Sequence, residues 1–152
     1  LFSAFEEEKV ACFVTDFPDE DLLKHPKVIG IPHLGASTPE SEANCAVMAV
    51  EQLSDFLENG NIKNSVNFPE THMPRNGKHR LITANRNIPK MVGKITNVLA
   101  DHDINISDML NKHRDNLAYN IIDLDDEIQP DQIEIIKGIE GIIMVRLLPQ
   151  KS

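Results

Sequence analysis

Apolar residues in the first half of the chain form two short runs, residues 10–17 and 27–32. Neither run alternates strictly between apolar and polar positions. Runs of this kind are typical of parallel strands that are covered on both faces. Residues 18–26 lie between them, contain two prolines and five charged or histidine side chains, and are predicted as a loop. The pattern therefore predicts two adjacent parallel strands of an α/β domain.

A long amphipathic helix is predicted after the second run. Thr38 can cap its start, and Pro39 suits its first position. Asn59 and Gly60 provide a left-handed stop at its end. Spacings of three and four residues place several apolar side chains on one face. These are Ala43, Ala46, Val47, Val50, Leu53 and Leu57. The stripe predicts that this face packs against another element.

The second half has a different pattern, in which strand-like and helix-like stretches alternate as β-α-β-β-α-β. Strands are predicted at residues 79–85, 104–112, 117–125 and 142–148, and helices at 88–103 and 130–141. This order is that of the ferredoxin-like fold, in which two helices cover one face of a four-stranded antiparallel sheet. Residues 67–78 contain two prolines and a glycine and are predicted as a linker. The expected division is therefore 1–66, a linker at 67–78, and a domain at 79–152.

Composition narrows the class of protein. The 152 residues include 24 acidic and 15 basic side chains, giving a net charge of −9. This balance argues against nucleic-acid binding, which depends on basic side chains. No apolar run approaches the length of a membrane span. Cys12 and Cys45 lack metal-ligand spacing and are expected to be buried, reduced thiols. A cytoplasmic protein without a metal site is expected.

The chain does not begin with methionine, and its first nine residues read like the interior of a helix. We therefore expect a piece of a longer polypeptide.

His33 stands where the second predicted strand ends, just ahead of the long helix. In open α/β sheets the carboxyl ends of strands are where ligands bind. Gly35, Ala36 and Ser37 follow with almost no side-chain bulk, which would let a flat ring approach the backbone. Taken alone, such a histidine is better explained as a strand-end residue with a satisfied hydrogen bond.

The motif around His33, "PHLGAST" at residues 32–38, occurs together with "VTDFP" at 14–18 and a long helix that runs into "LENGNIKNSVNFP" at 57–69. This combination resembles the end of the catalytic region of the D-2-hydroxyacid dehydrogenases, a Rossmann-type fold. The second half resembles an ACT regulatory domain. The resemblance implies oxidation of 3-phosphoglycerate with NAD, with His33 as general acid/base. It also implies that Asp16 and Gly35 lie beside the nicotinamide.

The same resemblance implies a carboxylate partner for His33 in the acidic loop after the first strand. Glu20 is the expected partner, while Asp19 and Asp21 remain alternatives. None of the seven glycines forms the G-x-G-x-x-G turn of a dinucleotide site, and the substrate-binding arginine of the family has no counterpart. The cofactor cradle is therefore absent from this sequence, and the chain alone is expected to be inactive.

In the ACT half the resemblance implies an amino-acid effector, L-serine, bound between two copies in a homo-oligomer. The expected contacts are Asn85 and Asn87 in the loop after the first strand, and Asn105 of the other copy. The asparagines are also explained as helix-capping and turn residues. A free-standing amino-acid-binding module and a pure assembly module remain alternative functions. The basic residues at 75–80 are expected to be solvated, and the acidic stretch 123–127 is expected to be a turn without a metal.

Overall fold

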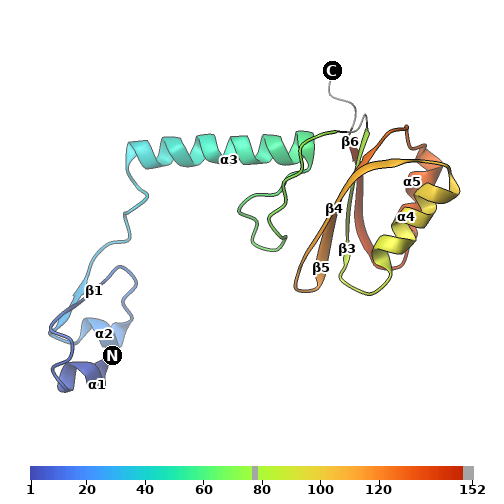
Figure 1. The fold of residues 1–152 in the computed structure, drawn as a ribbon. Helices are drawn as coiled ribbons and strands as arrows, with labels where there is room; N and C mark the ends of the chain where they lie inside the picture. Colours follow the sequence, from blue (N-terminus) through green and yellow to red (C-terminus); the bar gives the residue numbers. More distant parts are fainter. Residues whose placement is uncertain (77–78, 149–152) are drawn as a thin grey trace. The chain divides into compact units, whose positions relative to one another are not determined.

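The structure, a computed structural model, describes residues 1–76 and 79–148 (Figure 1). The chain divides into two compact units, Leu1–Val47 and Met48–Ser152. The first unit contains α1 (Phe2–Glu6), β1 (Phe13–Thr15), α2 (Glu20–Leu23) and β2 (Val28–Gly30). The long helix α3 (Pro39–Asn59) begins in the first unit and ends in the second. The expected boundary at residue 66 lies inside the second of these units and stays a prediction.

The two strands of the first unit pair in parallel, as the sequence predicts, with Phe13 opposite Val28. They are not covered on both faces, because Val14 is 56% exposed and Ile29 is 52% exposed. The loop predicted between them contains the short helix α2. Asp19 caps this helix by accepting a hydrogen bond from the Leu22 backbone N–H at 2.7 Å, a signal that the loop prediction missed.

Helix α3 has the predicted ends. Thr38 accepts from the backbone N–H of Ser41 at 3.2 Å, and Gly60 follows the last residue with φ of 73°. Its apolar stripe is exposed in the described structure. Cys45 lies on the same exposed helix, and Cys12 lies just before β1. Both cysteines are exposed. The expectation that they are buried is therefore wrong.

The second unit confirms the predicted β-α-β-β-α-β order. Its elements are β3 (His79–Arg86), α4 (Met91–Asp101), β4 (Ile106–Arg114), β5 (Leu117–Leu124), α5 (Pro130–Lys137) and β6 (Ile142–Leu148). All neighbours pair antiparallel in the spatial order β4-β5-β3-β6, which is the ferredoxin-like arrangement. The side chains of β3 and β5, the central strands, are almost entirely buried.

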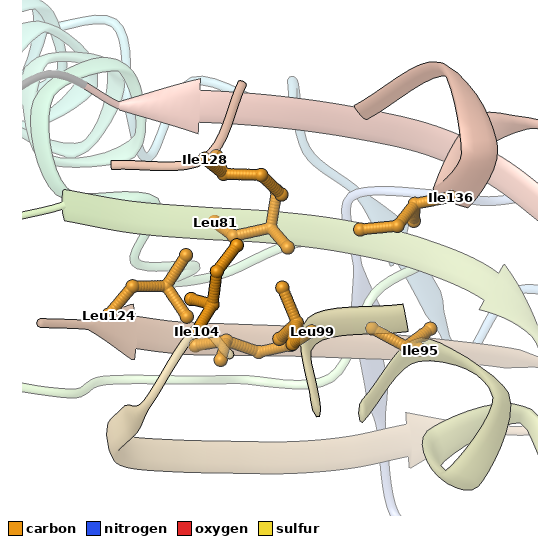
Figure 2. Close-up of a cluster of buried hydrophobic side chains, with 8 residues drawn as sticks. Leu81, Ile95, Leu99, Ile104, Leu124, Ile128 and Ile136 are labelled. Carbon is orange, nitrogen blue, oxygen red and sulfur yellow. The ribbon is translucent and has the colours of Figure 1, made fainter. Parts of the chain in front are cut away.

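Helices α4 and α5 cover one face of this sheet (Figure 1). Alternate residues of the central strands point to this face, as the two-residue period of a strand requires. They meet the apolar sides of both helices in a single cluster (Figure 2). Its buried members are Leu81, Ile95, Leu99, Ile104, Ile122, Leu124, Ile128 and Ile136.

The opposite face of the sheet is covered by residues 60–76, which we call the strap. Ile62 and Thr71 pair backbone to backbone within it, at 2.8 and 2.9 Å. Ile62 and Met73 pack on a second cluster that includes Ile82, Tyr119 and other buried side chains of the sheet. Much of the predicted linker 67–78 is thus part of the second unit. Gly77 and Lys78 lie outside the described residues.

A buried ion pair fastens the strap to the sheet. Arg80 and Asp123 have fully buried side chains, and the guanidinium donates to both carboxylate oxygens at 2.6 and 2.8 Å. Arg80 also donates to the carbonyls of Met73 and Pro74, each at 2.9 Å. Asp123 accepts from the backbone N–H of Asn76 at 2.9 Å. The expectation that Arg80 is solvated is wrong, and Asp123 lies in β5 rather than in a turn, because each charge is buried against the other and the strap.

Side chains from three strands cap the end of α3. The last carbonyls of a helix have no partner within it. Arg146 of β6 donates to the carbonyl of Leu57 at 3.0 Å, and Arg80 of β3 donates to that of Asn59 at 2.9 Å. Tyr119 of β5 donates to Gly60 at 2.8 Å. A Cβ at residue 60 would lie 2.4 Å from the side chain of Ile82, so this approach requires glycine.

The ion pair gives a stability prediction. Asp123→Asn leaves Arg80 as an uncompensated buried charge, which costs about 3–5 kcal/mol. Urea unfolding should show this loss in the free energy of unfolding.

The control is Glu134→Gln, which breaks the exposed Lys137–Glu134 pair and should change stability by less than about 0.5 kcal/mol. Equal effects of the two substitutions would contradict the assignment of Arg80 and Asp123 as the fastening of the strap.

Candidate functional site

The first site lies where β1 and β2 end. Asp16 directly follows β1, and His33 lies three residues beyond β2. Because the two strands are parallel and in register, their carboxyl ends meet at the same edge. The imidazole Nδ1 and the carboxylate Oδ2 are 2.6 Å apart. The ring of Phe17 lies beside the imidazole, with 4.4 Å between ring centroids.

The hydrogen bond fixes the tautomer of His33. An ionised carboxylate can only accept, so Nδ1 carries the proton and donates it to Asp16. In the neutral ring Nε2 then has a free lone pair and can accept a proton from a ligand. The bond to His33 is the main reason that the pKa of Asp16 is below its ordinary value of 3.8. Both side chains are substantially exposed, His33 at 60% and Asp16 at 45%.

The acidic loop does not supply the partner of His33 in this structure. Asp19 is engaged as the cap of α2, and Asp21 pairs with Lys24 at 3.0 Å. Glu20 lies in the first turn of α2, where its charge suits the helix dipole. The carboxylate bonded to His33 in this structure is that of Asp16, and a role for Glu20 stays a prediction. Gly35 has open space around its Cα, so a planar group could approach the backbone there.

The three asparagines expected to bind an effector have different surroundings. Asn85 is only 2% exposed, and both of its polar atoms are used. Its Nδ2 donates to the carbonyl of Arg86 at 2.7 Å, and its Oδ1 accepts from Asn120 at 2.8 Å. Asn120 is fully buried and also donates to Thr83, while Asn111 donates to Asn120. This amide network holds Asn85 inside the domain.

Asn87 and Asn105 are exposed at opposite ends of the sheet. Asn87 lies beyond Arg86, which pairs with Leu117, whereas Asn105 precedes Ile106, which pairs with Leu124. The seven steps from Leu117 to Leu124 correspond to roughly 23 Å of strand. One copy of the chain therefore does not bring these asparagines together. Asn105 is also bonded to the side chain of Asp125 at 2.5 Å.

Sequence reasoning missed Arg86 and Asn116, which line a recess of about 350 Å³ together with Asn87. An arginine next to asparagines in a strand-to-helix loop is a signal that could have found it. Within residues 1–76 and 79–148, no group of three or more histidine, cysteine, aspartate or glutamate side chains is placed to hold a metal ion. In the same described part, no helix has both the length and the apolar composition needed to cross a bilayer.

Comparison with curated proteins finds the same similarity repeatedly. The D-3-phosphoglycerate dehydrogenase of Escherichia coli K12 is 29% identical over 129 residues, which is 84% of this chain and 32% of that protein. The enzyme of Dictyostelium discoideum is 30% identical over 129 residues, 84% of this chain and 31% of that protein. This chain is similar to D-3-phosphoglycerate dehydrogenases. It spans about a third of the length of these D-3-phosphoglycerate dehydrogenase relatives.

Comparison with solved structures finds weaker likenesses. The alignment with the ACT domain of a GTP pyrophosphokinase from Chlorobium tepidum covers 46% of this chain and 95% of that domain's chain, with 17% identity and a TM-score of 0.38. The alignment with the regulatory subunit of aspartate kinase from Thermus thermophilus covers 52% of this chain and 56% of that subunit's chain, with 14% identity and a TM-score of 0.40. No family model matches the sequence. The ferredoxin-like fold of this unit rests on its own strand order.

The Asp16–His33 bond gives a pH prediction. A lowered pKa means that the folded state favours the carboxylate, so the bond is intact above the ordinary value of 3.8 and is lost as the pH falls through the lowered pKa. NMR titration of the Asp16 carboxyl should show this low pKa. His33→Asn should move the pKa back toward 3.8.

Lys24→Gln is the control. It removes a positive charge from the same unit, but Lys24 pairs with Asp21 and not with Asp16, so the pKa of Asp16 should not change. An Asp16 titration that does not change in His33→Asn would contradict the hydrogen bond.

Proposed function

We propose that this chain is part of an NAD-dependent D-3-phosphoglycerate dehydrogenase, corresponding to the end of its catalytic region and a regulatory domain. The oxidation would convert 3-phosphoglycerate to its 2-oxo acid. The similarity to enzymes of that name supports the reaction class. The Asp16–His33 pair carries the assignment to this chain, because it presents a proton acceptor at the carboxyl edge of two parallel strands.

His33 acts as the general base in this proposal. Loss of hydride from the substrate carbon requires removal of the hydroxyl proton, and an imidazole is suited to accept that proton near neutral pH. Nε2 accepts it because Nδ1 is committed to Asp16. Asp16 then stabilises the imidazolium and holds the ring in place. Asp16 takes the orienting role that the resemblance assigns to Glu20.

The fit to NAD is partial. When bound, NAD accepts the hydride. The open space at Gly35 suits the approach of a nicotinamide ring. The sequence lacks the glycine-rich turn that would hold the pyrophosphate. Residues outside this chain must therefore supply the cradle, and the chain alone is proposed to be inactive.

The second unit is proposed to bind an amino-acid effector, and L-serine is the ligand that the resemblance implies. Asn87 is exposed and available for such a ligand, whereas Asn85 is buried and acts by positioning the loop. Asn105 lies at the far end of the sheet, so its participation requires a second copy of the chain. The exposed edge strands β4 and β6 are where two sheets would associate.

A free-standing amino-acid-binding module is the alternative function. Its support is that the second unit has a core on both faces of its own sheet, within Met48–Ser152. Amino-acid binding without any dehydrogenase activity in the complete product of the gene would favour this alternative.

The catalytic proposal predicts the effect of removing the imidazole. In the complete product of the gene, His33→Gln should lower kcat by about 10²–10⁴-fold because the general base is lost. The KM for 3-phosphoglycerate should change little, since His33 acts on the proton in the transition state. Initial rates of NADH formation measure both.

Glu20→Gln is the comparison that separates the two carboxylates, and it should leave kcat within about twofold, whereas Asp16→Asn should lower it. A His33→Gln enzyme that turns over at the normal rate would rule out the proposed mechanism.

A further inference from the structure

The recess beside Asn87 has the composition of a small-molecule site. Its volume is about 350 Å³. Three segments form it: the loop between β3 and α4, the turn between β4 and β5, and the start of β6. The lining residues are Arg86, Asn87, Ile88, Asn116, Leu117 and Ile143.

Hydrogen bonds to backbone carbonyls hold the segments around this recess in place. The N–H of Asn87 donates to the carbonyl of Asn116 at 2.9 Å, and the Asn87 side chain donates to that of Asp115 at 3.1 Å. The N–H of Arg86 donates to Gly141 at 2.8 Å, which ties the loop to the turn before β6. These hydrogen bonds fix the positions of the segments that line the recess, as is usual in small-molecule sites.

The polar atoms that remain available suit the two charged groups of an amino acid. Within the described residues, the guanidinium of Arg86 and the side-chain amide of Asn116 make no hydrogen bond or ion pair. Asn87 uses its Nδ2 toward Asp115, which leaves Oδ1 as a free acceptor. A guanidinium binds a carboxylate in a bidentate manner, and amide oxygens accept from an ammonium group.

The rest of the lining is apolar. Ile88 is 46% exposed and Ile143 is 55% exposed, and Leu117, the first residue of β5, adds a third aliphatic side chain to the lining. Exposed aliphatic surface of this kind is stabilised when another aliphatic group covers it. The hydroxyl of a serine whose side chain pointed toward Ile88, Leu117 and Ile143 would find no hydrogen-bond partner among them.

We propose that the recess binds an α-amino acid with an aliphatic side chain, such as L-valine or L-leucine, in preference to L-serine. Arg86 holds the carboxylate, Asn87 and Asn116 accept from the ammonium group, and Ile88, Leu117 and Ile143 contact the side chain. This inference rests on the proposed function in that the second unit binds an amino acid. It names a ligand class different from the one that the resemblance implies.

A larger recess of about 440 Å³ lies between the strap and β4, but the arginine that lines it already donates hydrogen bonds to backbone carbonyls of the strap. Arg114, its arginine, donates to the carbonyls of Ser65, Val66 and Phe68 at 2.9, 3.2 and 3.4 Å. A ligand carboxylate would have to displace these bonds. Arg86 has no such competitor among the described residues, which favours the smaller recess.

Isothermal titration calorimetry on the chain tests the ligand class with L-valine, L-leucine and L-serine as probes. The expected result is at least tenfold tighter binding of valine or leucine than of serine, because a single methylene group in an apolar pocket changes discrimination by roughly 10–200-fold. Arg86→Met and Ile143→Ser should each weaken aliphatic binding at least tenfold. Both side chains are exposed, so thermal unfolding should show a retained fold.

Two matched controls should bind normally. Lys94→Met removes an exposed positive charge on α4, and Ile135→Ser removes an isoleucine that is 48% exposed on α5, outside the recess. Serine binding that is tighter than valine and leucine binding would overturn the inference and leave the proposed effector function standing. Aliphatic binding that ignores both recess variants would also overturn it. Failure of all three amino acids at 10 mM would contradict both proposals.

Discussion

The ion pair between Arg80 and Asp123 is the interaction on which the second unit depends most. The two side chains are fully buried between the sheet and the strap. A buried ion pair adds little net stability by itself, because desolvation of both charges offsets their attraction. Its importance here lies in what else it binds. The same guanidinium reaches the end of α3 and two carbonyls of the strap, so it determines which segment covers this face. We interpret the pair as a specificity device.

The order of strand-like and helix-like stretches was sufficient to predict the second unit, in which the central strands β3 and β5 are buried on both faces and the two helices bury one face each. The strap could not be predicted in this way. Arg80 stands in a locally basic stretch and Asp123 in a locally acidic one, and both patterns are typical of a surface. Arg80 and Asp123 are 43 residues apart in sequence. They meet because β3 pairs with β5 in a register that places Arg80 opposite Asp123, and local sequence patterns do not specify that register.

The first unit shows the opposite limit. Its parallel pairing and the start of α3 followed from local signals, such as the small residues and the cap at Thr38. The partner of His33 did not, because the resemblance directs attention to the acidic loop. Asp19 in that loop is used to cap α2. The carboxylate that reaches the imidazole follows the neighbouring strand directly. Similarly, Asn85 has the right residue type for a ligand contact, yet Asn120 from β5 takes its oxygen.

Tyr119 is the single tyrosine of a chain without tryptophan, and its hydroxyl donates to Gly60 at the end of α3. Burial is the main cause that raises its pKa to about 12, so the phenol stays protonated and keeps donating through the alkaline range in which a free tyrosine ionises. The near-ultraviolet absorption and intrinsic fluorescence of tyrosine in this chain therefore come from one ring, which lies where the end of α3 meets the sheet. Those signals report the docking of α3 without any added label.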